Sequence, residues 1–114
     1  MSFSWQGASG GWYDFDVARA KRVWEPVGGV YCFVKPGDYP TMEAGGPVML
    51  FVAKTHDFAG ALARHEMWQA AQQLGAAEVH LVVEHDEKRR GEIEQDLLKA
   101  HTPILNRQML RRVA

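Results

Sequence analysis

The sequence lacks the features that mark secreted and membrane-spanning proteins. Its 114 residues include one cysteine, Cys32, which cannot form an internal disulfide bond and lies in an apolar run, where we expect a reduced, buried thiol. No stretch approaches the roughly 20 apolar residues that a membrane-spanning helix needs. The first residues, MSFSWQGASGG, hold no basic segment followed by an apolar run. These absences predict a cytoplasmic protein with no membrane partner.

An excess of charge of either sign is also missing. The formal net charge is −1, which argues against an overall electrostatic attraction to nucleic acid but leaves room for a local patch. The C-terminal tail, residues 107–114, carries the one net-positive cluster, formed by Arg107, Arg111 and Arg112. The five histidines show no spacing typical of zinc ligands, so no zinc site is predicted.

Hydrophobic periodicity predicts a small α+β domain. Apolar runs rich in β-branched and aromatic residues predict strands at residues 29–35, 48–54 and 78–84. Helix-forming runs follow at residues 57–74 and 87–101. The β-β-α-β-α order predicts a central antiparallel or mixed sheet of three strands with helices on its faces.

The ends of the two predicted helices have recognisable signals. Gly75 is expected to cap the first helix at its C-terminus, and Asp86 to cap the second at its N-terminus. Pro103 stops the second helix, and residues 104–106 are expected to run back toward the core.

The N-terminal segment, residues 1–27, has a different character. Gly and Ser dominate at first, and four aromatic residues then lie close together: Trp5, Trp12, Tyr13 and Trp24. We expect this segment to pack on the domain as an extension, although such aromatics can also stack on nucleic-acid bases. Asp14 or Asp16 could cap a short helix that continues to Val23.

The stretch from residue 48 to residue 65 is central to the prediction of both fold and function. Its apolar strand leads through a polar elbow, KTHD, into the first helix. Thr55 or Asp57 can cap that helix through a side-chain oxygen. Because a strand that turns into a helix presents unpaired N–H groups, the elbow is a candidate anion site.

Three segments in order resemble the motifs of the GIY-YIG nucleases. GVY at residues 29–31 resembles the GIY tripeptide, and FVAKTHDFAGAL at residues 51–62 resembles the YIG strand with its helix. EQDLLKAHTPILN at residues 94–106 is similar to the glutamate helix and the closing Pro-x-Leu-Asn signature. The resemblance covers residues 28–106 and implies the GIY-YIG domain, and together the three motifs are more specific than any one of them.

That resemblance implies hydrolysis of DNA phosphodiester bonds with Mg²⁺ or Mn²⁺. Tyr31 would help to activate the attacking water, and Glu94 would bind the metal ion. Asn106 matches the closing asparagine, which is expected to be structural. The nucleic-acid-binding residues would be those of the polar turn and the basic tail, namely Lys54, Thr55, His56, Arg107, Arg111 and Arg112.

The sequence departs from the family pattern where the chemistry is expected. Phe51 replaces the second tyrosine, Ala53 replaces the YIG glycine, and Ala61 stands at the place of the catalytic arginine. An arginine offers a charged fork for phosphate oxygens, and its loss typically costs orders of magnitude in rate. Arg64, about one helical turn further on, or Lys54 could supply the missing cation.

Two classes of function and a third alternative follow, and whether the chain is an enzyme stays open at this point. The first is a catalytically impaired GIY-YIG-like domain, without a cofactor, that binds nucleic acid or protein. The second is an active, metal-dependent endonuclease with Arg64 or Lys54 as its catalytic cation. The third is a self-associating interaction protein, such as a homodimer. Ordinary structural roles also fit, because Tyr31 could be a half-buried strand residue and Glu94 could pair with Arg90 on the same helix.

Overall fold

A five-stranded antiparallel sheet forms the centre of the protein. The computed structural model describes residues 1–19, 23–37 and 46–113, with only the backbone from residue 109 onward. The strand order is β1-β2-β5-β3-β4, and every neighbouring pair is antiparallel. The strands are β1 (Ser2–Gln6), β2 (Trp12–Ala18), β3 (Gly29–Lys35), β4 (Val48–Thr55) and β5 (Glu78–Val83).

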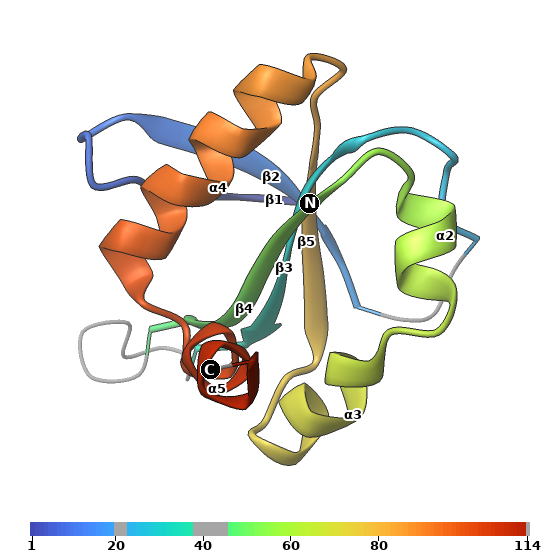
Figure 1. The fold of residues 1–114 in the computed structure, drawn as a ribbon, viewed down its shortest axis with the longest axis vertical. Coiled ribbons are helices and arrows are strands. Elements are labelled where there is room, and N and C mark those ends of the chain that lie inside the picture. Colours follow the sequence, from blue (N-terminus) through green and yellow to red (C-terminus); the bar gives the residue numbers. More distant parts are fainter. Residues whose placement is uncertain (20–22, 38–45, 114) are drawn as a thin grey trace.

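Helices cover both faces of this sheet. Figure 1 shows α2 and α3 on one side of the strands and α4 on the other. The helices are α2 (Phe58–Ala63), α3 (Glu66–Gln73), α4 (Glu87–His101) and α5 (Ile104–Val113). The predicted α+β class is confirmed. None of the helices in the described ranges is long and apolar enough to span a membrane.

The prediction of three strands is wrong because the N-terminal segment adds two more. β1 and β2 form a hairpin, and β2 pairs with β5 from Asp16 opposite Leu81 to Ala18 opposite Val79. The helix predicted to start at Asp14 or Asp16 is therefore also wrong as far as Ala18, and its residues 20–22 lie outside the described ranges. In this segment Asp14 and Asp16 alternate with the buried Phe15, and this period of two indicates a strand.

The two faces of the sheet carry separate hydrophobic cores. On the side of α2 and α3 the buried residues include Tyr31, Phe33 and Phe51. On the side of α4 they include Cys32 and Leu97. Cys32 is free and fully buried, as predicted, and burial raises the pKa of its thiol.

The single helix predicted over residues 57–74 is wrong, since the chain forms two helices. α2 ends at Ala63 and is followed by Arg64. His65 adopts an extended conformation and accepts the N–H of Met67 on Nδ1 at 3.1 Å, which begins α3. The predicted C-terminal cap is confirmed. Gly75 has a φ of +103°, and its N–H donates to Gln72 O at 3.0 Å while the N–H of Ala76 donates to Ala71 O at 2.9 Å, which is a Schellman motif.

The second predicted helix is confirmed as α4. Asp86 caps it by accepting the N–H of Lys88 at 3.1 Å, and the helix ends at Thr102, which has a φ of +38°. The residues after Pro103 return to the core as predicted, with Leu105 only 1% exposed. They do so inside a further helix, α5, which no signal in the sequence had predicted.

A polar network with a buried centre joins β1 and β5 to Arg19, the residue after β2. The indole N–H of Trp5 donates to His80 Nδ1 at 2.9 Å, so the ring proton must lie on Nε2, which bonds Glu78 Oε1 at 3.0 Å. Arg19 Nε donates to the other oxygen of Glu78 at 3.1 Å. Burial lowers the pKa of His80, which keeps the imidazole neutral and suited to this arrangement.

Candidate functional site

An open depression beside the start of β3 and the end of β4 brings two of the predicted catalytic residues together. Tyr31 faces Ala53 across the β3–β4 pair, and Arg64 approaches from the junction of α2 and α3. The depression is lined by Tyr31, Phe51, Ala53, Ala61, Arg64, His65, Glu66 and Met67. We call it the Tyr31 depression.

The hydroxyl of Tyr31 is held by His65. The two side chains meet at 2.8 Å between Tyr31 Oη and His65 Nε2. Because His65 Nδ1 accepts the N–H of Met67, the ring proton of the neutral imidazole lies on Nε2 and is donated to Oη. Burial lowers the pKa of His65, so the neutral form is favoured.

Tyr31 itself is a protonated phenol in this environment. The residue is only 4% exposed. Burial is the main cause that raises its pKa far above the ordinary 10.0, and the negative charge of Glu94 raises it further. A phenol of this kind can donate a hydrogen bond, but it does not take a proton from water near neutral pH.

Apolar groups occupy the surroundings of the phenol. The Phe51 ring is 3% exposed, stacks on Phe33 with ring centroids 5.5 Å apart and lies 6.3 Å from the Tyr31 ring. At this position the resemblance implies a second tyrosine hydroxyl. Ala53 and Ala61 add methyl groups to the same wall.

Arg64 supplies the positive charge of the depression. It is exposed and makes no hydrogen bond or ion pair with any residue in the described ranges. Glu66, two residues on, lines the same depression. The guanidinium is therefore available to an anion, although a carboxylate lies in the same wall.

Glu94 and Asn106 cover the outer edge of β4. Glu94 Oε2 accepts the N–H of Lys54 at 3.1 Å. Asn106 accepts the N–H of Val52 at 2.9 Å and donates to Val52 O at 2.8 Å. Both side chains thus replace a missing neighbouring strand, and for Asn106 this agrees with the expected structural role.

Glu94, the predicted metal ligand, has few described side chains near it that could help to coordinate a metal ion. Over the described parts of the chain, no group of three or more His, Cys, Asp or Glu side chains could hold a metal. With Oε2 engaged, Glu94 offers mainly Oε1, and phosphate oxygens and water would have to complete the coordination of Mg²⁺. The alternative ion pair with Arg90 is not formed, since Arg90 donates to the carbonyls of Glu84 and His85 at 3.0 and 3.3 Å.

The polar elbow does not offer the expected anion site. The first two N–H groups of α2 donate to carbonyls of the segment before β3, with Phe58 N to Val27 O at 2.9 Å and Ala59 N to Glu25 O at 3.2 Å. The Thr55 hydroxyl accepts the N–H of Asp57 at 3.1 Å, and the Asp57 carboxylate makes no capping bond. The first two backbone donors of this helix are therefore already used.

The remaining predicted nucleic-acid contacts lie near the β4 edge or on α5. Lys54 and His56 are exposed, and the Lys54 ammonium lies next to Gly91 of α4. Arg107 is exposed on α5, and Arg111 and Arg112 follow on the same helix. The side chains of Arg111 and Arg112 lie outside the described part of the structure.

Sequence reasoning missed the role of His65, which falls within the single helix predicted over residues 57–74. Its partner Tyr31 lies 34 positions away, so no local pattern could reveal the pair. The comparison of this chain with known protein families, curated proteins and solved structures yields no match. The motifs and the geometry of the site are therefore the basis for a proposed function.

Replacing Asn106 tests the edge-covering role. Asn106→Ala leaves the N–H and C=O of Val52 without a partner, so the free energy of unfolding should fall by about 2–4 kcal/mol. Urea denaturation measures this change. Arg107→Ala, at the next position on α5, is the matched control and should change stability by no more than about 0.5 kcal/mol. An equal effect of both substitutions would contradict the role of Asn106.

Proposed function

We propose that this chain is a GIY-YIG-like domain that binds nucleic acid without hydrolysing it. The observation that carries the proposal is the state of Tyr31, whose hydroxyl is buried, protonated and bonded to His65. Activation of water needs a nearby group that accepts a proton near neutral pH. Neither Tyr31 nor His65 meets that need, because Nδ1 of His65 already accepts the N–H of Met67.

Exposed cations around the β4 edge support the binding part of the proposal. Lys54, Arg64 and Arg107 are exposed, and none forms an ion pair within the described ranges. Such side chains can neutralise phosphates and release counterions. With a net charge of −1 for the whole chain, we expect weak binding that depends strongly on salt.

One observation favours the alternative of an active, divalent-metal-dependent endonuclease. Tyr31 and Arg64 line the same depression, so a phosphate held by Arg64 could accept a hydrogen bond from the Tyr31 hydroxyl. Glu94 would hold Mg²⁺ or Mn²⁺ through Oε1, and the bound metal would supply charge stabilisation to the phosphate. In this alternative neither Tyr31 nor His65 could act as the base for the attacking water, and Glu66 is the carboxylate among the described residues that line the depression.

A cleavage assay separates the two functions. Purified protein is incubated with supercoiled, linear and branched DNA in the presence of Mg²⁺ or Mn²⁺, and we expect no cleavage above background. Glu94→Ala and, as a matched control on the exposed face of α4, Glu92→Ala are assayed in parallel. Cleavage that is lost in Glu94→Ala but kept in Glu92→Ala would contradict the proposal. Cleavage that is equal in all three proteins indicates a contaminating nuclease.

A binding assay tests the nucleic-acid partner. Retention of labelled DNA is measured as a function of salt for the unaltered protein and for a variant with Arg107, Arg111 and Arg112 changed to Gln. The variant should bind more weakly, and the slope of log K against log salt should fall by about 0.9 for each phosphate that the variant no longer neutralises.

The matched control for that assay changes Lys88 and Arg89 of the first turn of α4 to Gln. The control should bind as the unaltered protein does, because neither residue belongs to the basic tail or to the predicted nucleic-acid contacts. Absence of DNA retention at low salt would exclude nucleic acid as the partner and favour a protein ligand.

A further inference from the structure

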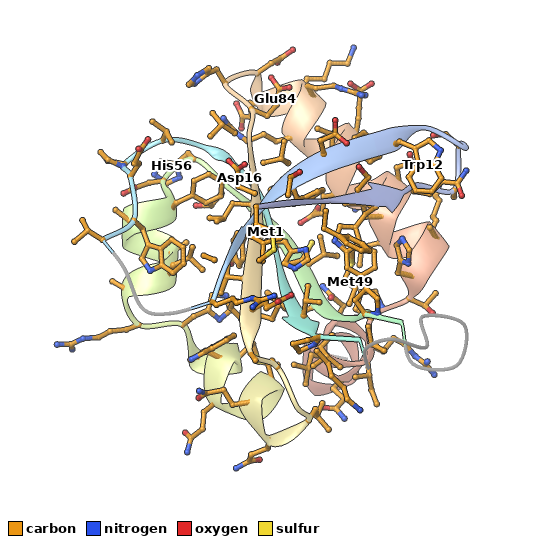
Figure 2. All side chains as sticks on the ribbon, turned by 180° about the vertical axis from the view of Figure 1, so that it is seen from behind. Met1, Trp12, Asp16, Met49, His56 and Glu84 are labelled. Atoms are coloured by element: carbon orange, nitrogen blue, oxygen red, sulfur yellow. The ribbon has the colours of Figure 1, made fainter. Side chains whose placement is uncertain are left out.

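The outer edge of β1 pairs with no strand in the described ranges. β1 is the first strand in the sheet order, and its neighbour is β2. Figure 2 shows Met1 at the start of this strand and Trp12 at the far end, beside the hairpin turn. The opposite edge, β4, is covered by the side chains of Glu94 and Asn106. The β4 edge thus has side-chain partners for its backbone groups, whereas β1 has no neighbouring strand on its outer side in the described ranges.

The hydrogen bonds of the hairpin reveal which groups of β1 point outward. The N–H of Gly7 donates to Gly11 O at 2.8 Å, and the N–H of Val17 donates to Met1 O at 2.9 Å. In an antiparallel pair, hydrogen-bonded residues alternate with residues that are not bonded. The N–H and C=O groups of the odd-numbered residues of β1 therefore point toward β2. The N–H and C=O groups of Ser2, Ser4 and Gln6 therefore point away from the sheet.

These outward groups have almost no partners. Within the described structure, only the Gln6 carbonyl is bonded, by His101 Nε2 at 2.8 Å, and a carbonyl oxygen can accept a second bond. β1 contains no charged residue and no proline, and its register with β2 is unbroken by a bulge. Natural proteins use those devices to keep edge strands from pairing with other chains.

We propose that β1 is a self-association surface that pairs antiparallel with β1 of a second copy, with the two-fold axis at Ser4. In this register Ser4 faces Ser4, and Ser2 faces Gln6 of the other copy. Every residue of these pairs has its N–H and C=O directed outward, so each pair can exchange two hydrogen bonds. The result is one continuous sheet through both copies.

The side chains of β1 suit a second copy of the same strand. The sequence SFSWQ alternates polar and aromatic residues and has the same alternation in both directions. Phe3, which is partly exposed, would face Trp5 of the other copy in a cross-strand aromatic pair. This reciprocity is what a two-fold interface requires.

Charge does not oppose the pairing. Asp14 of β2 accepts a hydrogen bond from the Ser4 hydroxyl. In the dimer the two Asp14 carboxylates would lie three strand spacings apart, or about 14 Å. That separation exceeds the Debye length of about 8 Å at physiological salt, so their repulsion is largely screened.

Engineered cysteines test the register directly. With the axis at Ser4, the Cα atoms of two Ser4→Cys copies lie about 5.5 Å apart, which a disulfide bond can span. Ser2→Cys is the matched control on the same exposed face, because its two copies lie about 14 Å apart and cannot be bridged. The native Cys32 is fully buried and should not take part.

We expect oxidised Ser4→Cys to form a covalent dimer and oxidised Ser2→Cys to stay mainly monomeric on a non-reducing gel. Equal cross-linking of both variants would indicate random collision and would overturn the proposal. Absence of cross-linking in Ser4→Cys would overturn it as well.

The unmodified protein supplies a second test by sedimentation over a wide concentration range. The unaltered chain should dimerise reversibly. Ser4→Pro removes the central outward N–H of each copy without touching the β1–β2 bonds, so the dissociation constant should rise about thirtyfold. Ser4→Thr keeps the N–H and should dimerise as the unaltered chain does. A chain that is monomeric at every concentration would refute the interface, whatever the outcome of the DNA assays.

Discussion

The structure depends on how the outer edge of β4 is hydrogen-bonded. Two helices that follow one another in the chain reach this edge, α4 through Glu94 and α5 through Asn106. Buried peptide groups without partners are costly, so these two side chains fix both helices against the sheet. Ala53 lies between the two bonded residues of β4 and faces Tyr31, which places the Tyr31 depression beside the same edge.

This arrangement changes what the GIY-YIG resemblance means for Glu94. The resemblance implies a metal ligand, and the structure gives the same carboxylate a backbone partner. A glutamate at this position therefore has a structural reason to be present without any metal ion. The same reasoning separates the two sheet edges. Side chains of α4 and α5 bond the edge of β4, whereas within the described ranges the outward groups of β1 other than the Gln6 carbonyl have no partner.

The sequence predicted the parts of the fold whose signals are local. The strands at residues 29–35 and 48–54 and helix α4 have strong periodicity and clear caps, and the structure contains all three. The N-terminal strands were missed because Asp14 and Asp16 were interpreted as helix caps, whereas they form the polar face of β2. The break between α2 and α3 was missed because the His65 side chain competes for a backbone N–H in the middle of a helix-forming run.

The candidate site was predictable in part. Tyr31 was predicted from the GIY-like motif and Arg64 as a substitute for the missing arginine, and they share one depression. The pairing of Tyr31 with His65 depends on the fold, since the two residues meet only when α3 packs on β3. The apolar surroundings of the phenol, with Phe51 against Phe33, likewise emerge only from packing.

The proposed function depends above all on Tyr31 being a buried, protonated phenol that cannot serve as a base. The most direct test is the ionisation of Tyr31, followed by NMR of tyrosine labelled at Cζ and assigned by comparison with Tyr31→Phe. We expect the Tyr31 signal to stay in its phenol form beyond the ordinary pKa of 10.0, at least until the protein unfolds. A Tyr31 that ionises near neutral pH would contradict this claim and favour an active nuclease.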